Sequence, residues 1–311
     1  MPVELCIQNR KAGFRQVEQR PLRRNEIRIK TQLTGLRHGD DLFLWKMAGW
    51  NDHSAPVAPL TWGVGEVVEV GSEVDRFAAG DMAHGPMPHR DYHIFQQDEA
   101  YPLAWLKKKF SVFADPGAAA LRCIHASGLK YGDRMAIFGM GAVGLMAAQY
   151  ALASGAGEVI AVDPLPSRLK TAQNLGAHTT IQNSLGEGDR WEKLADLDSV
   201  VELSGTDRGL SQCIQAARCG GTVTAGGLHY SAEAVEEARR ECLKKGTCFI
   251  EAENYPVRAD LERIVLKSLA DKTVIVWPIL SHVYSFQNVS LALQKIEQEP
   301  ESHIKVLLEY D

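Results

Sequence analysis

Three closely spaced glycines constrain the fold of this chain more than any other feature. Gly139, Gly141 and Gly144 lie between an apolar run, RMAIFG, and a segment with helical spacing, AVGLMAAQYALASG. In such a unit the first glycine makes the tight turn, the second lets the backbone approach a pyrophosphate, and the third lets helix pack on strand. The free N–H groups of the helix N-terminus favour an anion. The pattern predicts a dinucleotide-binding turn made by Gly139, Gly141, Ala142, Val143 and Gly144.

An acidic residue after the next predicted strand indicates which dinucleotide is bound. Asp163 closes the run EVIAVD, about 20 residues after the glycines, where a carboxylate binds ribose hydroxyls. A carboxylate there repels a 2′-phosphate, so we expect NAD rather than NADP as the cofactor. Arg168 is the opposing signal, because an arginine nearby can pair with a phosphate. Otherwise Arg168 flanks the adenine or is a solvated helix charge.

The two halves of the chain differ in pattern. Residues 1–115 contain short β-branched runs, such as EIRIKTQLTG and GVGEVVEVG, between Gly, Pro and Asn residues, which indicates a compact β-barrel-like unit. From about residue 116 strands alternate with helical segments, which predicts an α/β fold with a doubly wound parallel sheet. The tail, from residue 288 onward, reads as helix, turn and strand.

Composition narrows the class of protein. The 311 residues carry a net charge of −5, which gives no reason to expect nucleic acid or an acidic membrane as a partner. No apolar run is long enough to span a bilayer, and the N-terminal segment lacks the apolar core of a signal peptide. The 6 cysteines are scattered without a CxxC pair, which favours reduced thiols. We therefore expect a cytoplasmic protein.

Several motifs in a fixed order resemble the medium-chain dehydrogenase/reductase superfamily. They are GEVVEVGSEVDRFAAGDMAHG, GLKYGDRMAIFGMGAVGLMAAQ, VIAVDPLPSRLKTAQNLGA, VVELSG and GGTVTAGG. The resemblance implies a GroES-like catalytic barrel, residues 1–115 completed by residues 278–311, and a Rossmann domain, residues 116–277. It also implies a homodimer. In the superfamily the nicotinamide is lined by residues that match Ser204, Gly205, Gly226, Gly227 and Leu228.

Three further stretches resemble the zinc-type sugar and polyol dehydrogenases, including bacterial glycoside 3-dehydrogenases. They are GLRHGDD, FADPGAAALRCIHASGLKYGD and PESHIKVLLEY. The chain departs from that branch at its zinc ligands. Arg37 stands where the family has a cysteine, Thr61 and Trp62 stand where it has a His-Glu pair, and residues 82–113 lack the cysteines of the structural zinc lobe. We expect no metal of the usual kind, although a rebuilt site using Asp115, His38 or His84 stays open.

Without zinc, oxidation of an alcohol needs a side chain that takes the hydroxyl proton. His38 is one candidate, since Asp40 and Asp41 beside it could orient the imidazole; binding phosphate is its alternative role. Asp41 could instead cap the following helix. Asp115 is the other candidate, matching a shortened Glu-Pro pair of the polyol enzymes, and its alternative role is a structural turn. We expect most of His84, His89, Tyr92 and His93 to be surface or edge residues.

The resulting hypothesis is an enzyme: an NAD-dependent oxidoreductase that acts without catalytic zinc. It would interconvert a secondary alcohol and a ketone on a sugar, glycoside, cyclitol or similar polyol, the small-molecule partner. Two alternatives stay open. One is a zinc-free, NADPH-dependent reductase of activated C=C bonds, which the lost zinc ligands favour and Asp163 disfavours. The other is a non-enzymatic protein that binds NAD(H).

Overall fold

The computed structural model describes residues 1–8, 10–46, 58–104, 106–183, 194–256, 258 and 260–311. These residues form two compact units. Unit 1 consists of residues 1–115 and 280–311, and unit 2 of residues 116–279. Each unit has its own sheet and its own hydrophobic core.

Unit 2 is built on a six-stranded parallel sheet with the order β10-β9-β8-β11-β12-β13. The chain begins in the middle of the sheet, moves outward to β10, and then returns to build the other half from β11 to β13. The predicted doubly wound Rossmann sheet is thereby confirmed. Its strands are β8 (Arg134–Phe138), β9 (Glu158–Asp163), β10 (Thr179–Gln182), β11 (Leu197–Glu202), β12 (Ala217–Ala225) and β13 (Cys248–Glu251).

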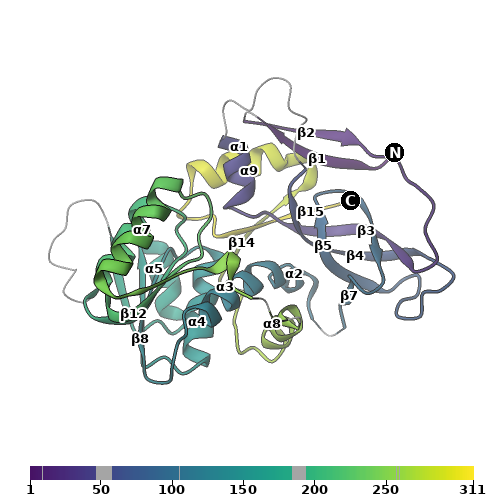
Figure 1. Cartoon of the computed structure of the whole chain (residues 1–311). Helices are drawn as coiled ribbons and strands as arrows, with labels where there is room; N and C mark the ends of the chain where they lie inside the picture. Colours follow the sequence, from purple (N-terminus) through teal and green to yellow (C-terminus); the bar gives the residue numbers. More distant parts are fainter. Residues whose placement is uncertain (9, 47–57, 105, 184–193, 257, 259) are drawn as a thin grey trace. The chain divides into compact units, whose positions relative to one another are not determined.

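Helices connect these strands and flank the sheet (Figure 1). Right-handed crossovers that run in opposite directions from the central strands place helices on both faces of such a sheet. The core between them consists of buried apolar residues such as Ile160, Val200 and Leu210. The helices are α4 (Ala142–Ala153), α5 (Pro166–Asn174), α6 (Asp207–Ala216), α7 (Ala232–Lys245), η2 (Ala252–Asn254) and α8 (Leu261–Ala270).

Unit 1 contains a seven-stranded sheet and a separate hairpin. The sheet has the order β14-β15-β3-β4-β5-β7, with β6 also paired to β3. Its pairs are antiparallel except for β14 with β15. The strands are β1 (Val3–Gln8), β2 (Lys11–Gln16), β3 (Glu26–Gly35), β4 (Leu60–Val70), β5 (Met82–Pro88), β6 (Tyr92–Gln96), β7 (Tyr101–Pro102), β14 (Leu280–Ser285) and β15 (Lys305–Glu309).

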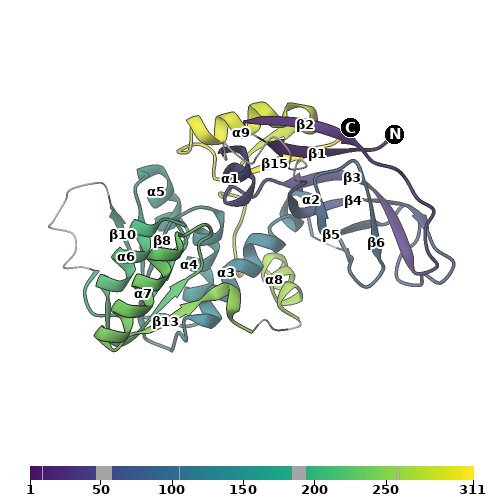
Figure 2. The ribbon, with the colours of Figure 1, turned by 45° about the horizontal axis from the view of Figure 1, so that its top comes forward.

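The C-terminal segment completes unit 1. Strand β15 pairs with β3, which brings Leu307 opposite Gly35. Helix α9 lies beside the β1–β2 hairpin (Figure 2), and its residue Val289 shares a buried core with Leu5 and Ile7. The helices of the unit are α1 (Asp40–Lys46), α2 (Lys108–Ser111), η3 (Phe286–Asn288) and α9 (Val289–Gln298). Helix α3 (Ala114–Ala126) begins in unit 1 and continues into unit 2.

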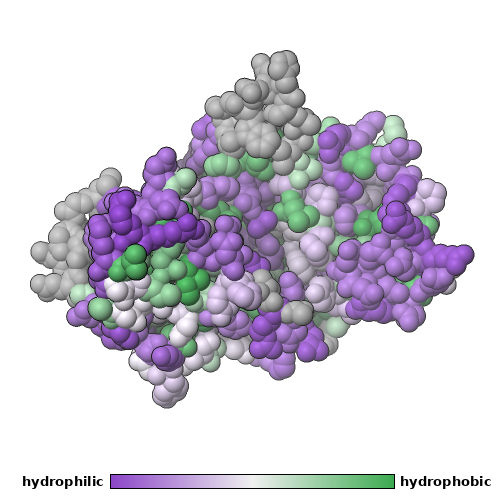
Figure 3. Space-filling view, in the orientation of Figure 1, coloured by the Kyte–Doolittle hydropathy of each residue, from purple (hydrophilic) through white to green (hydrophobic). Residues whose placement is uncertain are grey.

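The surface agrees with the modest charge of the sequence. Figure 3 shows a mainly hydrophilic face on which hydrophobic residues form small, separate patches. Among the described residues, no helix combines the length and the hydropathy needed to cross a membrane.

Candidate functional site

The glycine turn of unit 2 has the backbone that the sequence predicts. Gly139 follows β8 with φ +91°, a conformation that favours glycine. A Cβ on Gly144 would lie 1.8 Å from the Gly139 carbonyl oxygen, so only glycine lets α4 start this close to the turn. A Cβ on Gly141, by contrast, would meet nothing within 4 Å. The turn is thus packed on its inner side and open at Gly141, where the N-terminus of α4 presents backbone N–H groups.

Asp163 is fixed at the end of β9 beside this turn. Its Oδ2 accepts a hydrogen bond from the backbone N of Met140 at 2.7 Å, and its Oδ1 accepts one from Leu165 N at 2.8 Å. Arg168 lies close by in α5. Burial lowers the pKa of the Arg168 guanidinium, and the negative charge of Asp163 opposes that shift. The turn, the carboxylate and the arginine together fit the phosphate and ribose of a dinucleotide.

The ends of β11 and β12 bring the other predicted cofactor residues together. Gly205 has φ +69°, and a Cβ there would lie 2.6 Å from the Leu228 carbonyl oxygen. Gly227 packs equally closely against the other turn, since a Cβ added to it would lie 2.6 Å from Gly205 Cα. Ser204 and Gly226 flank these two turns in the sequence. A direct role of these five residues toward a nicotinamide stays a prediction.

A buried glutamate that we did not predict holds these turns in place. Glu202 accepts hydrogen bonds from Ser204 N at 2.8 Å, from Gly205 N at 3.1 Å and from the Tyr230 hydroxyl. Burial raises the pKa of the Glu202 carboxyl, and these hydrogen bonds oppose the shift. Burial also raises the pKa of Tyr230. The one available sequence signal is an acidic residue inside the apolar run VVELSG.

The second candidate site lies in unit 1 and is a group of five charged side chains, which we call the charge cluster: Arg37, Asp40, Asp41, Asp115 and Lys305. Arg37 is its centre. Its Nε lies 3.2 Å from Asp115 Oδ2, and its Nη1 lies 2.9 Å from Asp40 Oδ2. Both carboxylates come from first turns of helices, Asp40 from α1 and Asp115 from α3. From the sequence, Arg37 was notable only because it stands where the family has a cysteine.

Asp41 is the buried member of the charge cluster. Its Oδ2 accepts a hydrogen bond from the backbone N of Arg37 at 2.7 Å, and His89 Nε2 lies 3.4 Å away. His89 in turn shares a 2.6 Å hydrogen bond with Thr34, whose hydroxyl lies 3.2 Å from that of Tyr310. Asp41 lies within α1 and accepts an N–H from before the helix, so both of its predicted roles, capping the helix and orienting His38, stay predictions. His38 is half-buried in the turn before α1, and its catalytic role stays a prediction.

Lys305 enters the charge cluster from β15. It is 3% exposed, and its Nζ donates a hydrogen bond to the Leu36 carbonyl oxygen at 2.9 Å. A Cβ on Gly35 would lie 3.0 Å from that Nζ, so the glycine makes room for the side chain. Burial lowers the pKa of Lys305 to about 8, and the charges of Asp115 and Asp41 oppose the shift. The signal that could have found Lys305 is a lone lysine in the apolar strand IKVLLEY.

The expectation that most of the barrel histidines lie at the surface or an edge is wrong for two of them. His84 is 1% and His89 is 0% exposed. Trp62 donates its indole N–H to His84 Nδ1 at 3.0 Å, and burial lowers the pKa of His84 to about 4. Residues 83–85 of strand β5 are buried in succession, not alternately. Alternation therefore could not tell which histidines point inward.

The family resemblance raises the question of a catalytic zinc ion, and the donor set does not fit one. Zinc in proteins takes three or four Cys, His or carboxylate ligands. A guanidinium has no lone pair to give and stays protonated, and Arg37 is ion-paired to Asp115, one of the three ligand candidates. The Nδ1 of His84 is taken by Trp62. Within the described ranges, no three His, Cys, Asp or Glu side chains are grouped to hold a metal.

Comparisons with known proteins place these two sites in context. Residues 142–265 match the family described as zinc-binding dehydrogenase. The chain is 24% identical over 340 residues to D-guloside 3-dehydrogenase of Escherichia coli K12, and the aligned region covers 96% of each chain. It is 25% identical over 333 residues to sorbitol dehydrogenase 1 of Saccharomyces cerevisiae, covering 91% of each. The crystal structure of an alcohol dehydrogenase from E. coli CFT073 with NADH superposes with a TM-score of 0.82, at 17% identity and 99% coverage of each chain.

Proposed function

The chain belongs to the zinc-binding dehydrogenase family within the medium-chain dehydrogenase/reductase superfamily, and from that premise we propose that it is a polyol oxidoreductase. It interconverts a secondary alcohol and a ketone on a sugar, glycoside, cyclitol or similar molecule. The observation that carries this proposal is the glycine turn at Gly139–Gly144, open at Gly141. It occurs in a chain whose whole length is similar to enzymes named for polyol and glycoside substrates.

We propose NAD as the cofactor. The carboxylate of Asp163 supports it, because a negative charge at the end of β9 repels the 2′-phosphate of NADP. Arg168 is the residue that could weaken this preference, but the negative charge of Asp163 acts on its guanidinium and offsets part of its positive charge. When bound, the dinucleotide accepts or returns the hydride, which is chemistry that no protein side chain supplies.

The side chains of unit 1 supply the proton chemistry in this proposal, without zinc. Asp115 is partly exposed beside Arg37, and its carboxylate takes the proton of the substrate hydroxyl as the ketone forms. Asp41 orders the turn that carries Arg37 and His38, because it accepts the Arg37 backbone N–H. We propose that His38 binds phosphate or passes the proton onward. We also propose that the protein is a cytoplasmic homodimer.

The test is a cofactor and substrate panel on the purified protein. NAD and NADP are each offered with sugars, glycosides, cyclitols and linear polyols, and formation of the reduced dinucleotide is followed. We expect turnover with NAD on at least one polyol. The variant Asp163→Ser should gain activity with NADP by about tenfold or more, since roughly 1.4 kcal/mol of lost repulsion suffices for that change. Preference of the wild type for NADPH with turnover of enones would instead support the C=C reductase.

A further inference from the structure

The charge cluster offers more than a proton acceptor. We propose that Arg37 is a catalytic residue: its guanidinium binds the reacting oxygen of the substrate and stabilises the negative charge that develops there, with Asp115 as its acid–base partner. The inference rests on the proposed function and deepens it, because it names the group that does the work a metal ion would otherwise do.

The first support is the set of atoms that the ion pair leaves open. Arg37 uses Nε toward Asp115 and Nη1 toward Asp40 and the Leu60 carbonyl oxygen. Among the described residues, its Nη2 and the Oδ1 of Asp115 have no hydrogen-bond partner. The side chains of Arg37 and Asp115 are 33% and 28% exposed. A donor and an acceptor therefore stand side by side at an accessible place, which is the arrangement that a hydroxyl group, itself donor and acceptor, requires.

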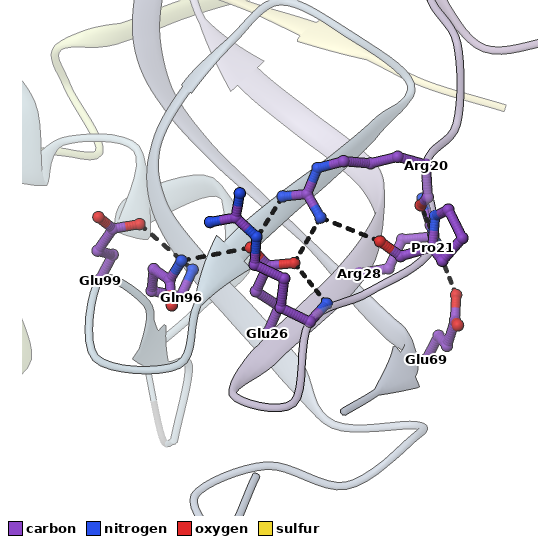
Figure 4. A network of polar contacts seen from close by, with 8 residues as sticks. Arg20, Pro21, Glu26, Arg28, Glu69, Gln96 and Glu99 are labelled. Carbon is purple, nitrogen blue, oxygen red and sulfur yellow. Dashed lines mark hydrogen bonds and ion pairs between the residues drawn. The ribbon is translucent and has the colours of Figure 1, made fainter. Parts of the chain in front are cut away.

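The second support is a contrast with a structural ion network in the same unit. Figure 4 shows Glu26 on β3, whose two oxygens accept hydrogen bonds from Arg20 at 2.6 and 2.8 Å. Arg23 N and Gln96 add further bonds to the same carboxylate at 2.8 and 3.3 Å. Glu26 is 1% exposed. The Glu26 network gives both oxygens of its buried carboxylate a donor, whereas the Arg37–Asp115 pair leaves one atom of each partner without a hydrogen-bond partner among the described residues.

The third support is how firmly Arg37 is held. Asp40 and Asp115 fix its guanidinium from two different helices, and Asp41 fixes its backbone N–H. Electrostatic stabilisation of a transition state depends on such preorganised donors, because no energy is then spent on reorienting them during the reaction. A guanidinium also stays protonated throughout the working pH range, so it supplies a permanent positive charge.

The reaction balances with these groups. In the oxidation direction the O–H bond of the substrate breaks and its proton passes to Asp115. The C–H bond on the same carbon breaks with its electron pair, which leaves as hydride to the oxidised dinucleotide, and the C=O bond forms. Arg37 donates hydrogen bonds to the oxygen while that oxygen carries negative charge. Reduction of the ketone reverses each step, and the proton returns from Asp115.

The test compares Arg37→Ala with Arg76→Ala in the full-length protein. Arg76 is a matched control because it is 40% exposed and lies 3.1 Å from Asp98 in the same unit. For the substrate found in the panel, we expect Arg37→Ala to lower kcat/KM by about 100- to 1,000-fold, the usual effect of removing one such donor. NADH affinity and the unfolding temperature should stay close to wild type. Free guanidinium at non-denaturing concentration should restore part of the lost turnover.

The outcomes separate this inference from the function on which it rests. Wild-type turnover together with an Arg37→Ala variant of nearly wild-type kcat/KM would overturn the role of Arg37 alone. A loss that guanidinium does not rescue would also overturn it. If Arg37→Ala does not fold, Arg37→Lys decides: a lowered kcat at unchanged unfolding temperature supports the role, and a wild-type kcat contradicts it. A wild-type chain inactive on every polyol would defeat the proposed function itself.

Discussion

Two arginine–carboxylate networks in unit 1 differ in how completely their charged atoms are used. The first, around Glu26, joins Arg20, Arg23 and Gln96 and leaves no carboxylate oxygen of Glu26 without a donor (Figure 4). The second is centred on Arg37 and, in the part of the chain that the structure describes, leaves Arg37 Nη2 and Asp115 Oδ1 without a hydrogen-bond partner on half-buried side chains. Both networks pair an arginine side chain with a carboxylate, so the presence of such a pair alone does not separate them.

The difference suggests separate roles: the Glu26 network stabilises the fold, and the Arg37 network serves the proposed reaction. A buried, saturated carboxylate stabilises the folded state because its removal leaves donors without partners. A half-exposed ion pair adds little to stability, so we look for its role in the reaction. The comparison therefore predicts opposite phenotypes: loss of activity at one network and loss of stability at the other.

The largest effect is expected at Asp115. The variant Asp115→Asn lacks the proton acceptor. Its kcat/KM should fall by about 10²- to 10⁴-fold, the usual contribution of general acid–base catalysis. The unfolding temperature should change little. Steady-state kinetics on the panel substrate measure the effect, with Asp98→Asn as the control from an exposed ion pair of the same unit. An Asp115→Asn variant with wild-type kcat/KM would end the distinction between the networks.

The second effect is expected at Glu26 and concerns stability. Glu26→Gln should cost about 1.5–3 kcal/mol in the free energy of unfolding, because it weakens hydrogen bonds between charged groups. The hydrogen bonds from Arg20 lower the pKa of Glu26 from 4.5 to about 2. Since the folded state binds the proton less readily, the advantage of the wild type is complete above pH 4.5 and disappears as pH falls through about 2. Urea unfolding at neutral and acid pH measures it, and kcat/KM should be unchanged.

The third effect is expected at Lys305; it has the same pH direction as the effect at Glu26 but falls in the alkaline range. Burial lowers its pKa from 10.5 to about 8. Between these values the unfolded chain binds more protons than the folded one, so the stability of the wild type rises with pH there, by at most about 1.4 kcal/mol per pH unit. Lys305→Met should lack this rise. Unfolding curves of both proteins between pH 7 and pH 10 test the sign, and parallel curves would contradict it.

The smallest effect is expected at an exposed pair. Arg24 lies 3.1 Å from Glu73, and their side chains are 79% and 59% exposed. Arg24→Ala should change the free energy of unfolding by less than about 1 kcal/mol, the range of surface ion pairs, and should leave kcat/KM unchanged. Thermal unfolding of Arg24→Ala and Glu26→Gln under the same conditions compares the two losses of stability. A larger loss than that of Glu26→Gln would show that saturation of the carboxylate is not what matters.

The backbone of the glycine turn in unit 2 could be predicted from the sequence because its requirements are local. Gly139 needs a positive φ, and Gly144 must let the helix start close to the turn. Asp163 lies at a fixed distance along the chain from both. These demands act on the backbone over a short stretch, so the pattern of residue types reveals them directly.

The charge cluster could be predicted only in part because its members are far apart in the sequence. The place of Asp115 before Pro116 suggested a polar site residue, whereas Arg37 was noted only because it stands in place of a family cysteine. Lys305 joins the cluster through the pairing of β15 with β3, which is a tertiary contact. Its burial and that of His89 depend on how neighbouring elements cover the strands, and no local pattern encodes that.

Metal dependence tests the central claim most directly, namely that the Arg37–Asp115 pair works in place of zinc. The protein is dialysed against a strong chelator, its metal content is measured, and kcat/KM on the panel substrate is determined before and after zinc is added. We predict full activity with only substoichiometric zinc, and no gain on addition. One tightly bound zinc ion per chain, with activity that is lost on chelation and restored by zinc, would contradict the account.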